Sequence, residues 1–240
     1  MKQWVCTTCG YNMIGDPPDV CPFCGAHHDK FLSWEEAEKT YRVTATQING
    51  SVTQLVSVPK LGLEHAAYRI ETENEAVWID CPSAFNRTLE PVSKIFFTHL
   101  HFMGASNQYR ELWNAKIYLH ALDAENSLTQ SFPIDERFNT DFVIDGLAAY
   151  HIGGHTPGYT LYIYQDVLFI CDYAFPPGPN MRLNPFGPKT ETLQKAERIL
   201  AIVKSSALKT VCGYNYVCEF KDWLPDFECA IKHWNLQLLS

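Results

Sequence analysis

This 240-residue sequence has few basic residues and lacks a long apolar run. Its 19 Lys and Arg stand against 27 Asp and Glu, for a net charge of −8, which argues against nucleic-acid binding. No apolar stretch is long enough to cross a bilayer, so we expect no membrane span. Internal repeats, a Ser-His-Asp set and a phosphate-cradling glycine loop do not stand out either.

A secretory signal is also not expected, because a cysteine pair already begins at Cys6. The chain has nine cysteines. An odd remainder, once four are assigned to a metal, predicts reduced thiols and a cytoplasmic location. We expect that remainder to be small apolar core residues: Cys81, Cys171, Cys212, Cys218 and Cys229. At 46% hydrophobic residues, the chain can fill a substantial core and is not disordered.

Two matched cysteine pairs stand near the N-terminus. They read C-T-T-C-G from Cys6 and C-P-F-C-G from Cys21. Each knuckle points two thiolates at one position, and its glycine allows a backbone conformation that a side chain would hinder. Two knuckles form a tetrahedral sulfur cage that suits iron or zinc. The sequence therefore predicts one metal ion with four ligands: Cys6, Cys9, Cys21 and Cys24.

The residues around the knuckles resemble those of a known small domain. Trp4 precedes the first knuckle and Tyr11 follows it, while Phe31 follows the second. With these neighbours, residues 1–36 resemble the short rubredoxin domains of rubrerythrins. The resemblance implies one iron on the four cysteines, cycling between ferrous and ferric states. A zinc ribbon stays open as the alternative, because both metals accept the same cage.

The rest of the chain predicts a mixed body. Ser33 and Glu36 form a capping box for a short linking helix at 33–41. Apolar runs predict strands at 52–58, 66–72, 76–80, 94–98, 116–119, 142–144, 148–152, 160–164 and 167–171. Helical spacing predicts helices at 105–113 and 122–129, one capped by Thr190 and one capped by Asp222. We expect a small metal domain at 1–36 and an α+β body, sheets covered by helices, at 37–240.

The body carries a second set of candidate metal ligands. His99 and His101 follow an apolar run, and alternate residues of an extended chain point the same way. His155 lies in the turn-rich segment 153–158, and Asp172 ends the run 167–171. Three histidines and a carboxylate at loop positions after strands predict a metal site.

These segments resemble the metallo-β-lactamase superfamily over roughly residues 45–220. The Thr-His-x-His step at Thr98, the Gly-His-Thr-Pro-Gly segment and the aspartate closing a later strand occur in the family's order. Asp80 matches an earlier strand that ends in aspartate. The resemblance implies a four-layer αββα sandwich with metals at one edge of the sheets.

The chain departs from the family at three ligand positions. The family usually continues T-H-x-H-x-D-H, whereas this chain has Met103 at the aspartate position and Gly104 at the next histidine. Tyr214 stands where the final histidine is expected. A thioether and a glycine cannot replace a carboxylate and an imidazole on zinc. The resemblance implies that the second metal of the usual pair is lost, and that the first keeps its ligands: His99, His101, His155 and Asp172.

Two interpretations of that remaining site stay open. In one, a single iron or zinc ion sits on His99, His155 and Asp172, with His101 as a ligand or as a neighbour of the ligands. Two histidines and a carboxylate with open positions suit ferrous iron, and some superfamily members that oxidise sulfur compounds use such a site. In the other interpretation the site holds no metal and the fold is a scaffold.

The favoured function is that of a redox enzyme or electron-transfer protein. A four-cysteine iron has no open position, so it passes electrons, and a second site with open positions can receive them for oxygen, peroxide or a sulfur species. Flavodiiron proteins pair this fold with redox centres, although this chain lacks their flavodoxin-like domain. We therefore expect a reductase or redox partner protein and an unidentified small substrate. The resemblance also implies a homodimer as one oligomeric state.

Two other functions stay open. In a hydrolase of thioesters, esters or lactams, the metal lowers the pKa of a bound water. Asp172 then orients that water, and His101 and Asp172 are the catalytic candidates. In a non-catalytic assembly or binding factor, the degenerate site has no chemical role. In each case we expect the Pro176–Pro179 stretch to border the site and Tyr214 to pack mainly in the core.

Overall fold

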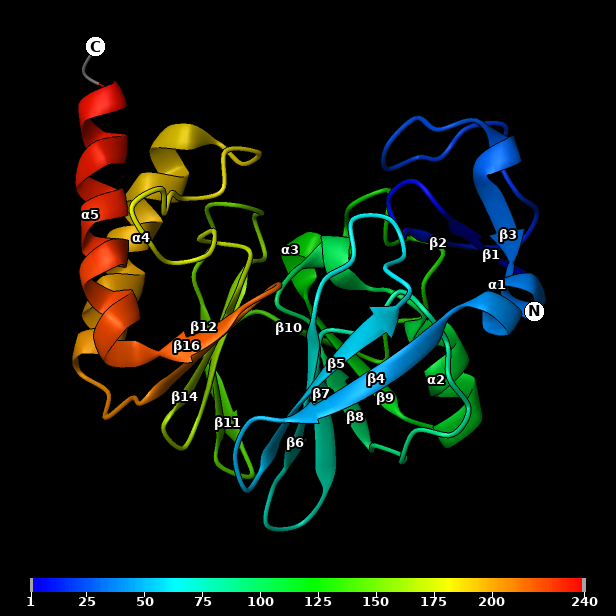
Figure 1. Cartoon of the computed structure of the whole chain (residues 1–240), viewed down its shortest axis with the longest axis horizontal. Coiled ribbons are helices and arrows are strands. Elements are labelled where there is room, and N and C mark those ends of the chain that lie inside the picture. The colour runs from blue at the N-terminus through cyan, green and yellow to red at the C-terminus, as the bar shows by residue number, and fades with distance from the viewer. Residues whose placement is uncertain (1, 239–240) are drawn as a thin grey trace. The chain divides into compact units, whose positions relative to one another are not determined.

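The computed structural model describes residues 2–238 (Figure 1). The chain divides into two compact units, Met1–Phe138 and Asn139–Ser240. The predicted 1–36 domain falls within the first unit, and its boundary at residue 36 stays a prediction. None of the described helices is long and apolar enough to cross a membrane.

The first unit begins with a small antiparallel sheet of order β2-β1-β3. Its elements are β1 (Gln3–Cys6), β2 (Asn12–Ile14), the 3₁₀ turn η1 (His28–Lys30) and β3 (Phe31–Ser33), followed by helix α1 (Trp34–Thr40). The Ser33 hydroxyl accepts from the Glu36 N–H, and the Glu36 carboxylate accepts from the Ser33 N–H. This confirms the predicted capping box, which satisfies backbone donors at the start of α1.

A seven-stranded sheet forms the main part of this unit. Its strands pair in chain order: β4 (Arg42–Gln47), β5 (Val52–Val58), β6 (Ala67–Glu71), β7 (Ala76–Ile79), β8 (Lys94–Phe96), β9 (Lys116–His120) and β10 (Glu136–Phe138). Strands β7 to β10 run parallel, with Ile79 opposite Phe96. The C-terminal ends of β7 and β8 therefore bring Asp80 and Thr98 to the same edge of the sheet.

Three short helices follow these strands: η2 (Leu100–Phe102), α2 (Ser106–Trp113) and α3 (Ala121–Ala124). Helix α2 packs on the sheet through aromatic rings. The Tyr109 ring lies 4.7 Å from that of Trp78 in an edge-to-face contact, and the Trp113 ring lies 5.1 Å from Trp78. Trp78 and Tyr109 are fully buried, so this cluster anchors the helix that follows the His99–His101 segment.

The small sheet packs tightly on the rest of the first unit. The Gln3 amide donates to Gln108 Oε1 at 2.6 Å, and the Asn107 amide donates to Gln3 Oε1 at 3.2 Å, all three residues being buried. A Cβ at Gly62 would contact Gly10 N and lie 2.5 Å from Cys9 C. Since two backbones touch there, the first knuckle sits directly on the body.

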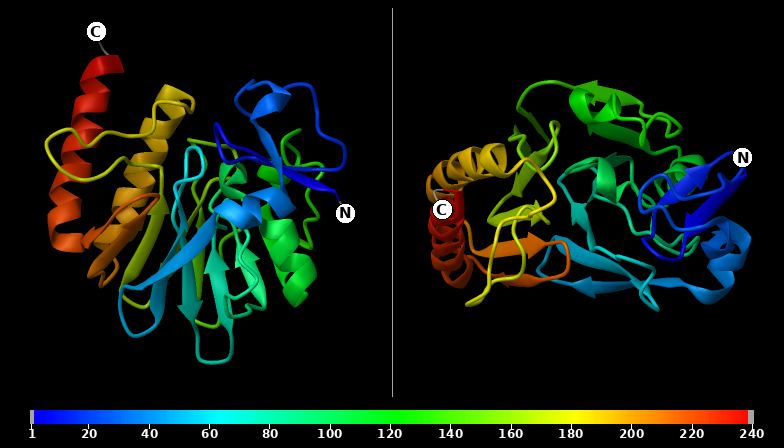
Figure 2. Two further views of the ribbon diagram at one scale, coloured as in Figure 1. Left: turned by 45° about the vertical axis from the view of Figure 1, so that its right-hand side comes forward. Right: turned by 90° about the horizontal axis from the view of Figure 1, so that it is seen from above.

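The second unit holds a six-stranded sheet of order β11-β12-β13-β14-β15-β16. Its strands are β11 (Phe142–Ile144), β12 (Leu147–His151), β13 (Thr160–Tyr164), β14 (Val167–Cys171), β15 (Thr210–Gly213) and β16 (Val217–Glu219). Helices α4 (Lys189–Lys204) and α5 (Phe220–Leu238) lie side by side (Figure 2). Both add side chains to one apolar core with the sheet, which fits the i, i+3, i+4 spacing of apolar residues in α4.

Most predicted elements of the body are confirmed, but the end of one helix and two helix caps are wrong, and strands β4, β10 and β16 were not predicted from the sequence. The predicted helix at 122–129 ends at Ala124 in α3, because the chain then forms turns. Thr190 and Asp222 are not caps: α4 begins at Lys189 after Pro188, and Asp222 lies in the first turn of α5. Strand β4 was not expected because most of its side chains are exposed, so it lacks alternating apolar residues.

Candidate metal centres

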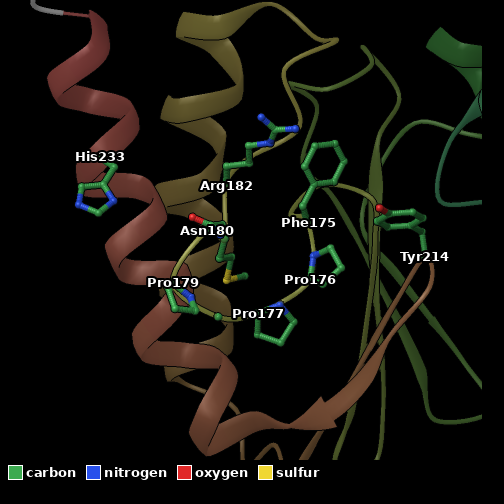
Figure 3. Close-up of a pocket in the computed structure, with 10 residues that line it drawn as sticks. Phe175, Pro176, Pro177, Pro179, Asn180, Arg182, Tyr214 and His233 are labelled. Atoms are coloured by element: carbon green, nitrogen blue, oxygen red, sulfur yellow. The ribbon is translucent and has the colours of Figure 1, made fainter.

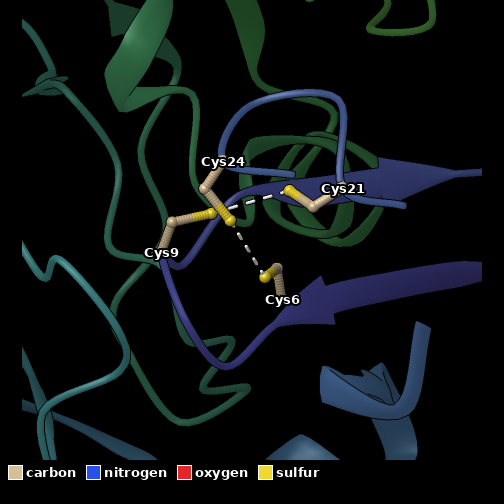
Figure 4. A group of neighbouring side chains, drawn as sticks. All are labelled: Cys6, Cys9, Cys21 and Cys24. Carbon is tan, nitrogen blue, oxygen red and sulfur yellow. Dashed lines mark hydrogen bonds between the residues drawn. The ribbon is translucent and has the colours of Figure 1, made fainter. Parts of the chain in front are cut away.

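The four predicted cysteines converge on one point (Figure 4). Their sulfur atoms lie within 4.8 Å of one another. The Cys6–Cys24 distance is 3.8 Å and the Cys9–Cys21 distance is 3.7 Å. A regular tetrahedron with metal–sulfur bonds of about 2.3 Å has sulfur–sulfur edges of about 3.8 Å. The cage therefore fits a tetrahedral zinc or iron ion.

Both knuckles are closed by the glycines that the sequence singled out. The Gly10 N–H donates to Cys6 O at 2.7 Å, and the Gly25 N–H donates to Cys21 O at 2.8 Å. Their φ angles are +82° and +74°, a region that glycine enters without the penalty that a side chain incurs. The glycines thus allow each pair of sulfurs to face the same point.

Burial and backbone hydrogen bonds act against each other on these thiols. Burial raises the pKa of the Cys21 thiol to about 11, although hydrogen bonds from the backbone of Cys24 and Phe23 lower it. At Cys24 burial also raises the pKa, but hydrogen bonds from the Ala26 backbone and the neighbouring thiols outweigh it, so the net pKa is lowered. A bound cation favours all four thiolates, so metal binding releases protons here.

The first two predicted histidines lie in the loop after β8, in the first unit. His99 is fully buried, and its Nδ1 lies 3.0 Å from the Thr98 hydroxyl. That hydroxyl lies 2.9 Å from Asp80 Oδ2, and the Thr98 N–H donates to Asp80 Oδ1. Asp80 and Thr98 thus fix the His99 ring through Nδ1, which leaves Nε2 as the atom for a ligand role.

His101 lies beside His99 and against the second knuckle. Its ring centroid is 4.9 Å from that of His99, and a ligand nitrogen of each lies within 4.8 Å of the other. The Phe23 ring, from between Cys21 and Cys24, contacts His101 edge to face at 5.3 Å. No local sequence pattern indicates this contact, which joins the predicted metal domain to the predicted histidine site.

Gly104 stands at one of the missing ligand positions, and the backbone around it leaves no room for a side chain. Its φ is +47°, and a Cβ there would run into the backbone oxygens of Cys81 and Pro82 and lie 2.8 Å from Pro82 C. Met103 is buried in the core of the unit. Neither position presents a ligand to an ion, and the loss of the second metal stays a prediction.

His65 belongs to the surroundings of this loop, although it lies far from it in sequence. Its ring stacks on Phe102 at 3.8 Å, and Phe102 in turn lies 4.7 Å from the His99 ring. His65 Nε2 lies 2.7 Å from Cys81 O. His65 therefore supports the His99–His101 loop through its contact with Phe102. No local sequence pattern indicates this role.

Acid will weaken the first unit through His65. Burial lowers the pKa of His65 from 6.5 to about 4, so the unfolded chain binds the extra proton between these pH values. Stability is therefore fully present above pH 6.5 and falls as the pH drops, by about 3 kcal/mol at pH 4. Urea unfolding of the wild type and of His65→Gln at several pH values measures this. Equal acid sensitivity of the two proteins would contradict it.

The other two predicted ligands lie together in the second unit. His155 Nε2 is 3.6 Å from Asp172 Oδ2. The Asn184 amide donates to Asp172 Oδ2 at 2.9 Å and to Asp172 O at 3.0 Å. Burial lowers the pKa of His155 to about 4, so its ring is neutral at pH 7, as a metal ligand must be.

Asn184 and Cys171 are additions that sequence reasoning did not make. Asn184 lies in a loop with no motif around it, so only its contact with Asp172 shows its role. Cys171 was expected as a core residue and is buried, but its Sγ and the Asp172 carboxylate offer ligand atoms within 4.8 Å of each other. That the two histidines of the first unit and the His155–Asp172 pair of the second share one ion stays a prediction.

The second unit has an open pocket of about 850 Å³, and most of the residues that line it come shortly after Asp172 in the chain. The predicted Pro176–Pro179 stretch lines it, with Phe175, Arg182 and Tyr214 (Figure 3). Tyr214 stands on one side and His233 of α5 on the other. Tyr214 is therefore only partly a packing residue: burial raises the pKa of its hydroxyl, and the Asp172 charge raises it further.

Comparison with known proteins agrees with both halves of this description. Residues 4–32 match the family described as rubrerythrin, rubredoxin-like domain. No curated protein matches the chain in sequence. The small domain found by sequence is thus confirmed as rubredoxin-like.

Solved structures show the fold of the rest. A metallo-β-lactamase from Pontibacter korlensis is 16% identical, over 80% of this chain and 99% of that chain, with a TM-score of 0.62. The metallo-β-lactamase FIM-1 from Pseudomonas aeruginosa, in its mono-zinc form, is 15% identical over 80% of this chain and 96% of that chain, with a TM-score of 0.63. An archaeal metallo-β-lactamase superfamily protein from Sulfolobus tokodaii is 16% identical over 73% of this chain and 80% of that chain, with a TM-score of 0.53. The chain therefore joins a rubrerythrin-type rubredoxin-like domain to a metallo-β-lactamase fold.

Proposed function

We propose that this chain is a redox metalloprotein. The four cysteines of the cage would hold an iron that supplies one-electron chemistry. His99, His101, His155 and Asp172 would hold a single ion of the body that receives the electron. A reductase or redox partner protein delivers the electrons, and Cys24, the exposed cysteine of the cage, marks the side from which it approaches.

The observation that carries this proposal is the packing of the cage against the histidine loop. A four-cysteine metal has no open position for a substrate, so electron transfer is the chemistry left to it. A purely structural metal domain need not touch the body's own ligands. Here a residue of the second knuckle contacts His101 within one compact unit.

The body site suits one ion with open positions. Two histidines and a carboxylate are the ligands of many mononuclear ferrous sites, and such iron supplies one-electron chemistry toward oxygen, peroxide or a sulfur species. The chain's own residues prepare the site. Asp80 and Thr98 orient His99, and Asn184 fixes the Asp172 oxygen nearest to His155.

Metal content and absorption spectra of protein purified without oxygen test the proposal. We expect two irons in the wild type, one in Cys24→Ser and one in His155→Ala, with the ferric-thiolate absorption kept only by the second variant. Zinc in both sites of the wild type would overturn the redox function. Iron in the cage alone would leave an electron carrier or assembly factor.

Replacing Thr98 by valine will weaken metal binding at the body site. The variant keeps the shape of the side chain but removes the hydroxyl between Asp80 and His99. Loss of such a supporting hydrogen bond typically lowers metal affinity about 10- to 100-fold. Competition with a chelator measures this. Thr53→Val, on β5 with its hydroxyl 3.1 Å from Gln47, is the control, and equal affinities for all three proteins would contradict the prediction.

A hydrolase is the second candidate, and one observation favours it. FIM-1, a solved structure with this fold, is described in a mono-zinc form, so one metal does not by itself point to redox chemistry. A single zinc lowers the pKa of a bound water, which Asp172 would orient. Steady cleavage of a thioester, ester or lactam that is lost in His155→Ala would favour this function over the redox one.

A further inference from the structure

Phe23 occupies a distinctive position in the second knuckle. It stands between Cys21 and Cys24, so its backbone is bonded to two of the sulfur ligands. Its side chain is half-buried and leaves the cage toward the body. The ring stacks on Tyr11 at 6.0 Å with 9° between the planes, and meets His101 edge to face at 5.3 Å.

The body holds the Phe23 ring in this position. The Tyr11 hydroxyl donates to Leu128 O at 2.5 Å, and the Phe132 ring meets Tyr11 edge to face at 6.1 Å. Both partners of Tyr11 come from the segment after α3. The centroid distances lie within the range of about 4.5–7 Å that favours aromatic pairs. Phe23 is therefore packed between Tyr11 and His101.

The distance between cage and histidine loop is also fixed by contacts away from Phe23. The backbone contact of Gly62 with the first knuckle leaves no room for sliding. The Asn12 amide donates to Ser83 O at 3.2 Å, which adds a buried polar contact across the same junction. Because the cage and the histidine loop are joined at several points, the distance between them stays constant. An efficient electron path requires a constant distance between its two ends.

We propose that Phe23 is the bridge for electron transfer from the four-cysteine iron to the ion at His101, an inference that rests on the proposed redox function. The route runs from a cysteine ligand through the Phe23 ring to the His101 ring. One electron moves: the cage iron goes from ferrous to ferric, and the ferric body iron becomes ferrous. No bond forms or breaks, and no proton is transferred.

The bridge matters because electrons tunnel faster through packed atoms than across an open gap. The ring spans the space between the knuckle and His101, and its edge contacts the imidazole. A smaller, saturated side chain would leave part of that space empty. Phe23 is thus a positioning residue for electron flow and touches neither substrate nor metal.

Rapid photochemical reduction tests the proposal on the full-length, iron-loaded protein. A photogenerated one-electron reductant reduces the cage iron, and the return of its ferric-thiolate absorption reports transfer to the body iron. In the wild type we expect a first-order return whose rate does not depend on protein concentration. Phe23→Leu should slow it several-fold, while a redox titration shows the potential of the cage iron unchanged.

Three further variants make the result specific. Phe23→Tyr keeps the ring and should retain the wild-type rate. Phe23→Met fills the space with a flexible saturated chain and should be slow, and it replaces Phe23→Leu if that variant loses its iron. Phe220→Leu removes an aromatic ring that stacks on Trp223 within the second unit and is not part of the proposed route, so it should leave the rate unchanged.

The outcomes separate this inference from the proposed function. Slow transfer in Phe23→Leu and Phe23→Met alone supports the bridge. Wild-type rates in both variants would overturn the bridge and leave the redox function intact. A wild type that holds both irons but shows no transfer at any protein concentration would overturn the redox function and this inference with it.

Discussion

Cys9→Ser will lose the metal of the four-cysteine site and unfold the small N-terminal sheet. The sheet of β1, β2 and β3 is too small to hold together by its own apolar core. For such domains the free energy of metal binding supplies the free energy of folding, about 10–16 kcal/mol for structural zinc peptides. Because Cys9 is buried against Gly62, its loss will also loosen the junction with the body.

Metal analysis and amide hydrogen exchange measure this result. We expect less than one metal ion per chain at the cage and loss of protection at residues 3–33, whereas the second unit keeps its protection. Cys229→Ser is the matched control, because Cys229 is an exposed cysteine on α5. A Cys9→Ser protein with full metal content and a protected N-terminal sheet would refute the prediction.

Gly104→His will not restore the second metal site of the fold, although it places the family's residue at the family's position. A side chain at φ +47° costs about 1–2 kcal/mol. Its Cβ would also press on the backbone oxygens of Cys81 and Pro82, and such overpacking costs about 1–3 kcal/mol. The free energy of unfolding should fall by about 3 kcal/mol, without an additional bound metal.

Urea unfolding and metal analysis of Gly104→His give the result directly. Gly50→His is the control, because the described residues leave open space around the Gly50 Cβ position. A Gly104→His protein of wild-type stability with an extra metal ion would contradict the prediction. It would show that the second site is lost only through its ligand and not through the shape of the loop.

Local signals account for most of what the sequence could predict. Knuckle spacing predicted the cage, because the four ligands lie in two short turns. The Thr98–His101 step and Asp172 follow apolar strands, and that pattern predicted them at strand ends. Ser33 and Glu36 sit three residues apart, so their reciprocal hydrogen bonds could be predicted from the chain alone.

What the sequence could not predict depends on contacts between distant segments. Gly62 matters because it meets the first knuckle, and nothing near Gly62 in the chain indicates that contact. Asn184 and His65 carry no motif, and each gains its role from one neighbour far away in sequence. Phe23 reads as an ordinary knuckle residue until His101 is placed beside it.

The four cysteines of the cage are unevenly buried, and this sets the order in which they bind and release the metal ion. Cys6, Cys9 and Cys21 are buried, and Cys24 is exposed. An incoming ion that meets a folded chain must therefore enter past Cys24, and a departing ion must release Cys24 first. Exchange with an external chelator then follows the local opening of the second knuckle and not the unfolding of the protein.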